Sequence, residues 1–185
     1  PASQMVAAGD DFCMFNIGYN ERLHAFGAPC RVDGLTILYC MKGHVKLSVN
    51  LHEYDIKDND LIVASPGNII KVTDVPEQDL EHLKYVVVVM SSKFCSELKM
   101  DLRKLLKDGL DLMERPVVSL SEKMQTLLGR YLTLMAELVQ VEGTFKDSAL
   151  TSLASSMLSV VAGVWLESLD EQRTSPSHQT TRSRM

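Results

Sequence analysis

The stretch GLTILYCMKGHVKLSVNLHEYDIKDNDLIVASPGN, residues 34–68, decides the fold class of this chain. In its middle, Val45, Leu47, Val49 and Leu51 alternate with polar residues, and a period of two places them on one face of a β-strand. Turn-forming residues interrupt the stretch at Lys42-Gly43, at Asp58-Asn59-Asp60 and at Ser65-Pro66-Gly67-Asn68. The pattern therefore predicts short antiparallel strands that wrap into a small β-barrel, whose interior could hold a ligand.

Strand-like patterns extend on both sides of this stretch, as far as about residue 90. The expected strands cover residues 12–17, 32–41, 45–50, 53–56, 60–65, 68–73 and 82–90. The last of them contains Tyr85 followed by four valines, a run that suits a strand buried on both faces. The first dozen residues and the segment 19–29 have no such pattern, so we expect them to be irregular.

The apolar period changes to 3.6 residues after residue 90, which predicts helices. Short helices are expected over residues 92–99 and 101–113, the first capped by a serine. Ser119 and Glu122 have the spacing of a capping box, which predicts that a longer helix begins there. A last helix should follow over residues 144–169. Two amphipathic helices joined by so short a connection predict an antiparallel αα-hairpin.

These patterns divide the chain into four parts. Residues 1–90 form the N-terminal arm and the β-barrel, and residues 91–118 form the short connecting helices. Residues 119–170 form the αα-hairpin, which is expected to serve packing and dimerisation. Residues 171–185 are rich in Ser, Thr and Arg and have nothing to bury, so we expect a disordered linker.

The apolar composition of the last expected helix predicts that the chain forms a homodimer. Its apolar residues cover more than half of its circumference, so it needs cover on two sides. The barrel could cover one side and the same helix of a second copy the other, across a two-fold axis. The alternative is that the preceding helix covers the whole remainder. The expected interface residues are Leu150, Leu153, Met157, Val160, Val161 and Val164.

Composition restricts the classes of function. The net charge of −5 over 185 residues argues against a free-standing nucleic-acid binder. The four cysteines form no CxxC pair, so we expect free thiols and a cytoplasmic location. No run approaches about 20 uninterrupted apolar residues and no signal peptide is evident, so no membrane contact is expected. Because the chain begins with Pro1, we expect a processed or trimmed N-terminus.

Motifs for catalysis, metals and cofactors are absent from the sequence. No two of the five histidines lie three to five residues apart, and apolar Ile69 and Ile70 follow the Pro66-Gly67-Asn68 turn where a metal-binding barrel needs a ligand. There is no Gly-x-Ser-x-Gly elbow and no glycine-rich phosphate loop. We therefore expect no metal, no cofactor, no catalytic residue and no enzymatic activity.

The order of arm, barrel, short helices, αα-hairpin and polar tail resembles the N-terminal sensing and dimerisation domain of AraC-type transcriptional regulators. The residues that carry the resemblance are 29–34, 41–49, 61–69 and 86–94, with Asp60 at the Asp of the cupin strand–turn series and Asn59 in place of its Gly. The resemblance implies a cupin-like antiparallel barrel, that is, a double-stranded β-helix. It also implies a dimer, and DNA binding through helix-turn-helix units that do not occur in this sequence. We expect a trimmed domain rather than a stand-alone sensor.

The resemblance also implies where an effector would bind. The matching positions are Ile70, Val72, Lys84, Val86 and Val88, of which only Lys84 is polar. Such a pocket suits a small, mostly apolar effector and is poor for a sugar. Two alternatives remain open at this point: a stand-alone cupin-type small-molecule binder or enzyme, and a structural dimerisation module without a ligand.

Overall fold

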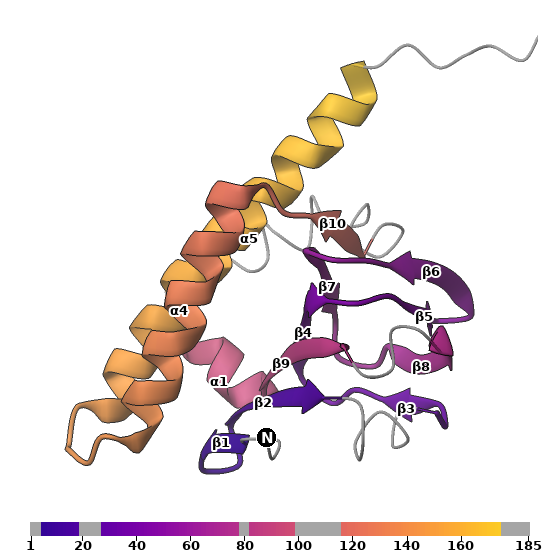
Figure 1. The fold of residues 1–185 in the computed structure, drawn as a ribbon. Coiled ribbons are helices and arrows are strands. Elements are labelled where there is room, and N and C mark those ends of the chain that lie inside the picture. The colour runs from indigo at the N-terminus through magenta and orange to yellow at the C-terminus, as the bar shows by residue number, and fades with distance from the viewer. Residues whose placement is uncertain (1–4, 19–26, 78–81, 99–115, 175–185) are drawn as a thin grey trace, which may run out of the picture.

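The computed structural model describes residues 5–18, 27–77, 82–98 and 116–174. Its strands are β1 (Met5–Ala8), β2 (Phe12–Gly18), β3 (Cys30–Arg31), β4 (Leu35–Lys42), β5 (Val45–Val49), β6 (His52–Ile56), β7 (Asp60–Ala64), β8 (Ile69–Asp74), β9 (Lys84–Met90) and β10 (Val117–Ser119). Its helices are α1 (Ser92–Glu97), α4 (Glu122–Gln140) and α5 (Lys146–Thr174). The predicted combination of antiparallel strands with helices after them is confirmed (Figure 1).

The strands form two antiparallel sheets. The larger sheet has the order β1-β2-β9-β4-β7-β10, and the smaller one has the order β3-β8-β5-β6. Strand β9 lies between β2 and β4 and pairs with both from Lys84 to Met90. The turns between strands lie where the sequence predicted them, because Gly43, Asn59 and Gly67 all have positive φ.

Alternate residues of the larger sheet pack into two separate apolar layers. The inner layer lies between the two sheets and consists of Val32, Leu38, Cys40, Val45, Leu47, Val49, Ile56, Ile62, Ala64, Ile70, Leu83, Tyr85 and Val87. The outer layer joins the other face of the larger sheet to the helices, and it includes Tyr39, Val86, Val88 and Met90. Strand β9 is therefore buried on both faces, as predicted.

Helices α4 and α5 cover the outer face of the larger sheet (Figure 1). Helix α4 buries Leu128, Leu132, Met135 and Val139, which recur at helical spacing. Helix α5 runs alongside α4, and the hydroxyls of Tyr131 and Ser156 meet at 2.6 Å between them. The larger sheet thus has an apolar layer on each face. The smaller sheet covers the inner layer, and the helices cover the outer layer.

By length and composition alone, helix α5 could span a membrane over Lys146–Ser168. The lack of an uninterrupted apolar run predicted no such helix. In the structure, 44% of the 18-residue apolar window of this helix is buried inside the fold. The buried core helix of a soluble protein can have the same length and composition. Trp165 of α5 is almost completely buried.

Helix α1 is fastened to the turn between β1 and β2. The Ser91 hydroxyl accepts a hydrogen bond from the amide of Phe94 at 3.0 Å, which is the predicted serine cap. The same hydroxyl donates to a carboxylate oxygen of Asp11 at 2.7 Å, and the Lys93 ammonium lies 2.7 Å from the other oxygen. Together with the hydrogen bond from the Ser91 amide to the carbonyl of Asp11 at 2.9 Å, these two side-chain contacts hold residue 11 against the start of α1.

Several predictions about segments were wrong. The first dozen residues include strand β1, which pairs with β2, and the segment 91–118 includes strand β10, which pairs with β7. Helix α5 continues to Thr174, into the predicted linker. The capping box is not formed, because Ser121 is the residue before α4 and the Ser119 hydroxyl donates to Asp60 instead. The predicted helix over 101–113, most of the segment 19–29 and residues 175–185 lie outside the described residues.

Candidate functional site

The inner layer is the candidate site, because the polar side chains of Cys40 and Tyr85 are buried there among apolar residues of both sheets. Cys40 and Tyr85 are direct cross-strand partners in the pairing of β4 with β9. The pairing slips by one residue immediately after them, between Cys40 and Lys42. The side chains of Cys40 and Tyr85 are therefore neighbours, since residues opposite each other have Cβ atoms about 5 Å apart.

The Tyr85 hydroxyl lacks a conventional hydrogen-bond partner among the described residues. The side chain is 3% exposed, and its oxygen is completely covered. A buried hydroxyl without a partner costs about 1–3 kcal/mol of stability, so native proteins rarely retain one. Within the described ranges, this hydroxyl is a donor in an apolar layer with no oxygen or nitrogen atom to accept its proton.

Cys40 is the polar group beside that hydroxyl. Its thiol is fully buried and donates weakly to the carbonyl oxygen of Gly43 at 3.3 Å. Burial raises the pKa of the Cys40 thiol to about 11, and the neighbouring Asp58 and Asp60 carboxylates act in the same direction. Burial also raises the pKa of the Tyr85 hydroxyl, as does Cys40. Both groups are therefore neutral at pH 7, and neither is suited to act as a nucleophile.

The residues predicted to bind a ligand do not lie together. Ile70 belongs to the inner layer and Val72 packs against it. Val86 and Val88 face the opposite way, into the outer layer. Lys84 is exposed at the start of β9. The set therefore does not form one site: on β9 it is Tyr85 and Val87, one residue out of step with the predicted positions, that face the inner layer.

The predicted dimer residues lie mostly inside the chain's own core. Leu150, Met157 and Val161 are buried in the outer layer, and Leu153 and Val164 are partly buried against it. Val160 is also partly buried. Large exposed apolar side chains of this region lie on α4 and just after it, at Leu134, Val141 and Phe145, and on α5 at Leu166; they are 50%, 51%, 81% and 43% exposed.

The Asp58-Asn59-Asp60 turn uses its carboxylates for structure. Asp58 accepts a hydrogen bond from the amide of Gly43 at 2.6 Å. Asp60 accepts one from the amide of Lys57 at 2.8 Å and another from the Ser119 hydroxyl. Over the described ranges, no three side chains of His, Cys, Asp and Glu gather as metal ligands would. On the far side of the smaller sheet, His44 meets Asp55 at the surface.

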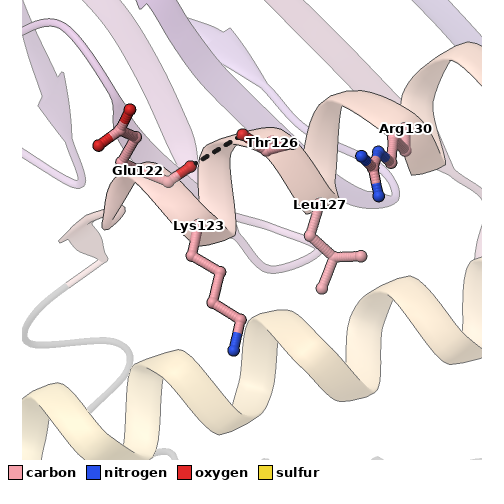
Figure 2. A pocket seen from close by; sticks show the side chains of 5 residues that line it. All are labelled: Glu122, Lys123, Thr126, Leu127 and Arg130. Atoms are coloured by element: carbon pink, nitrogen blue, oxygen red, sulfur yellow. Dashed lines mark hydrogen bonds between the residues drawn. The ribbon is translucent and has the colours of Figure 1, made fainter.

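A second hollow lies on the surface of α4. It has a volume of about 450 Å³ and is lined by Glu122, Lys123, Thr126, Leu127 and Arg130. Figure 2 shows that Lys123 and Leu127 point towards α5, while the Thr126 hydroxyl bonds back to the carbonyl of Glu122 at 3.1 Å. It is open to solvent, and all of its lining residues come from a single helix.

Comparisons with known proteins find likeness in structure and none in sequence. No protein-family model matches the chain, and no curated protein matches it. Apo ToxT K231A from Vibrio cholerae is 11% identical at a TM-score of 0.49, over 89% of this chain and 57% of that one. The AraC-like transcriptional activator CuxR is 12% identical at a TM-score of 0.44, over 83% of this chain and 49% of that one.

The β-strand part is also similar to cupin proteins. An RmlC-like cupin with a double-stranded β-helix fold from Methanocaldococcus jannaschii is 11% identical at a TM-score of 0.37, over 49% of this chain and 79% of that one. The chain thus spans about half the length of the two regulators and most of the length of this cupin. These similarities are to AraC-like regulators and to cupins, and they are too distant to assign the chain to a family.

Proposed function

We propose that this chain is the ligand-sensing and dimerisation domain of an AraC-type transcriptional regulator, whose DNA-binding part lies outside these residues. The proposal includes no catalytic activity, no metal and a cytoplasmic location. The single observation that supports it most is the Tyr85 hydroxyl in the inner layer, beside which the described residues place the Cys40 thiol and no oxygen or nitrogen partner. An apolar ligand with one acceptor oxygen that binds between the sheets would satisfy that hydroxyl.

The chemistry of the inner layer defines the ligand class. Tyr85 is a neutral donor and Cys40 is a neutral thiol, so these two groups offer no charge to a cation and only one strong donor to a sugar. The remaining residues of the layer are aliphatic, apart from their backbone. We therefore expect a small apolar carboxylic acid, ketone or sterol, bound through one oxygen to Tyr85.

Thermal unfolding with a panel of such compounds tests this proposal. A ligand of the native state raises the melting temperature by mass action, and at 100 times its Kd it adds about 2.7 kcal/mol. The panel should contain aliphatic and aromatic carboxylic acids and steroid ketones, with arabinose as the polar control. We expect at least one apolar member, and not arabinose, to raise the melting temperature.

The Tyr85→Phe variant shows whether such a shift arises in the inner layer. Removing an unsatisfied hydroxyl leaves no buried polar group behind, so the variant should fold. It should lose most of the ligand-induced shift. Tyr39→Phe is the matched control, because Tyr39 is equally buried but faces the outer layer from the same sheet. An unchanged shift in Tyr85→Phe, or no shift with any member of the panel, would overturn the ligand-sensing proposal.

The cupin-type enzyme remains the second candidate, since cupin proteins are among the structural neighbours. It requires a bound metal in most such barrels, and the described residues offer no cluster of ligands for one. Metal analysis of the purified protein separates the two: stoichiometric iron, zinc or manganese would favour the enzyme.

A further inference from the structure

The turn Asp58–Asp60, called here the coupling turn, contacts the inner layer on one side and the start of α4 on the other. The amide of Asn59 donates to the carbonyl of Cys40 at 2.7 Å. The carbonyl of Asn59 accepts from the amide of Leu120 at 3.0 Å. One residue thus joins the strand that carries the Cys40 thiol to Leu120, two residues before the start of helix α4.

Side chains reinforce both ends of this connection. Asp58 bonds to the amide of Gly43, whose carbonyl receives the Cys40 thiol. Asp60, which is almost completely buried, accepts from the Ser119 hydroxyl at the end of β10. Ser119 is the residue that the capping-box pattern assigned to the start of the helix.

The connection continues into α4. Leu120 is buried in the outer layer, and its carbonyl accepts from the side-chain amide of Gln125 at 2.8 Å. Asn59 has φ of 71°, a left-handed conformation that asparagine adopts more readily than most residues. This conformation places the N–H and C=O groups of Asn59 on partners in two different parts of the fold.

We propose that the coupling turn transmits a displacement of Cys40 in the inner layer to the start of helix α4, with Asp60 and Ser119 as positioning residues. The inference rests on the proposed function, because it names the route by which a bound ligand would reach the helices. The proposal states that Cys40 and Ser119 are coupled by a free energy, which can be measured without any ligand.

A double-mutant cycle read by hydrogen exchange tests it. The variants are Cys40→Ala, Ser119→Ala and the double variant, and the measured quantities are the exchange rates of the Leu120 and Gln125 amides. Independent sites give fold-changes that multiply to within about twofold, whereas coupled sites deviate by about fivefold or more. We expect the double variant to deviate by at least about fivefold from the product of the single changes.

Ser121→Ala is the matched control. Ser121 lies two residues further on, immediately before α4, and its side chain makes no capping hydrogen bond. Combined with Cys40→Ala, it should multiply to within about twofold. Ser119→Thr keeps the hydroxyl and should preserve the coupling, which separates loss of the bond to Asp60 from general disturbance of β10.

Two results would contradict the proposal: multiplicative behaviour of Cys40→Ala with Ser119→Ala, or equal deviation with Ser121→Ala. If Ser119→Ala does not fold, Asp60→Asn replaces it in the same cycle, with the same expectation. Failure of the ligand screen would overturn the proposed function and leave this coupling standing. A multiplicative cycle would overturn the coupling and leave ligand binding standing.

Discussion

Gly34 is a position where the fold leaves no space for a side chain. A Cβ atom placed there would lie 2.2 Å from the carbonyl oxygen of Met90, which belongs to the backbone of β9 and cannot move aside. Gly163 in α5 is the opposite case, because nothing lies within 4 Å of its Cβ position. The two glycines therefore serve different purposes, although neither has positive φ.

We expect Gly34→Ala to destabilise the protein by about 1–3 kcal/mol or more, because of overpacking against backbone. Gly163→Ala should stabilise it by about 0.5–1 kcal/mol, because alanine has the higher helix propensity. Urea denaturation of both variants checks the prediction. If both substitutions change the free energy of unfolding equally and with the same sign, the close contact between residue 34 and β9 is contradicted.

Tyr85 shows how far single residues could be predicted. The β-branched run predicted a strand buried on both faces, and this is confirmed. Because both faces are apolar, the pattern contains no information on which face looks inward, and the predicted site was placed on Val86 and Val88. Only the pairing of Tyr85 with Cys40 shows which face of β9 looks towards the inner layer.

Ser119 was similarly ambiguous, since a serine before an acidic residue suits a helix cap and a strand end equally.

The turn before β2 and the start of α1 form one unit through Asp11. Hydrogen bonds from Lys93 and then from Ser91 lower the pKa of the Asp11 carboxyl. A carboxyl with a lowered pKa stabilises the folded state above its unfolded pKa of about 3.9. That stabilisation is lost as the pH falls through the lower, folded-state pKa.

We therefore expect Asp11→Asn to be less stable than the wild type at pH 6 and to approach it at pH 2.5. Chemical denaturation at the two pH values measures the difference. Asp10→Asn is the matched control, since Asp10 is the exposed neighbouring residue, and it should show little difference at either pH. If the gap between wild type and Asp11→Asn is the same at pH 2.5 as at pH 6, Asp11 does not fasten α1.

Helices and strands could be predicted where their apolar residues repeat with a regular period. They could not be predicted where they form only by pairing with another strand. The residues of α4 and α5 repeat at helical spacing over many turns, and both helices were found. Strands β1 and β10 are only 4 and 3 residues long and exist through their pairing with β2 and β7. Such short segments contain too few residues for a period, so only the tertiary contacts define them.

The molecule as a whole has a helical side with exposed apolar residues. Leu134 and Val141 lie seven residues apart, on α4 and just beyond it, and Phe145 follows in the connection to α5. We propose this face, rather than the buried residues of α5, as the surface through which two copies associate. Helices that repeat apolar residues at this spacing commonly pack against a second helix.

Sedimentation velocity tests the dimer. We expect the wild type to sediment as a dimer and Leu134→Glu as a monomer, because a charge at the centre of an apolar interface is not compensated. Met41→Glu is the control, since Met41 is similarly exposed, at 48% against 50%, but lies on β4 away from the helices. A dimer that survives Leu134→Glu, or a wild type that is monomeric at all concentrations, would contradict the proposed interface.

The position of the ligand relative to the larger sheet is the most direct test of the whole account. Methyl NMR of the valines of β9, during titration with the compound that most raises the melting temperature, distinguishes the two faces within three consecutive residues. We predict large shifts for the methyl groups of Val87, which faces the inner layer, and small ones for Val86 and Val88. Larger shifts at Val86 and Val88 than at Val87 would place the ligand among the helices and contradict the account.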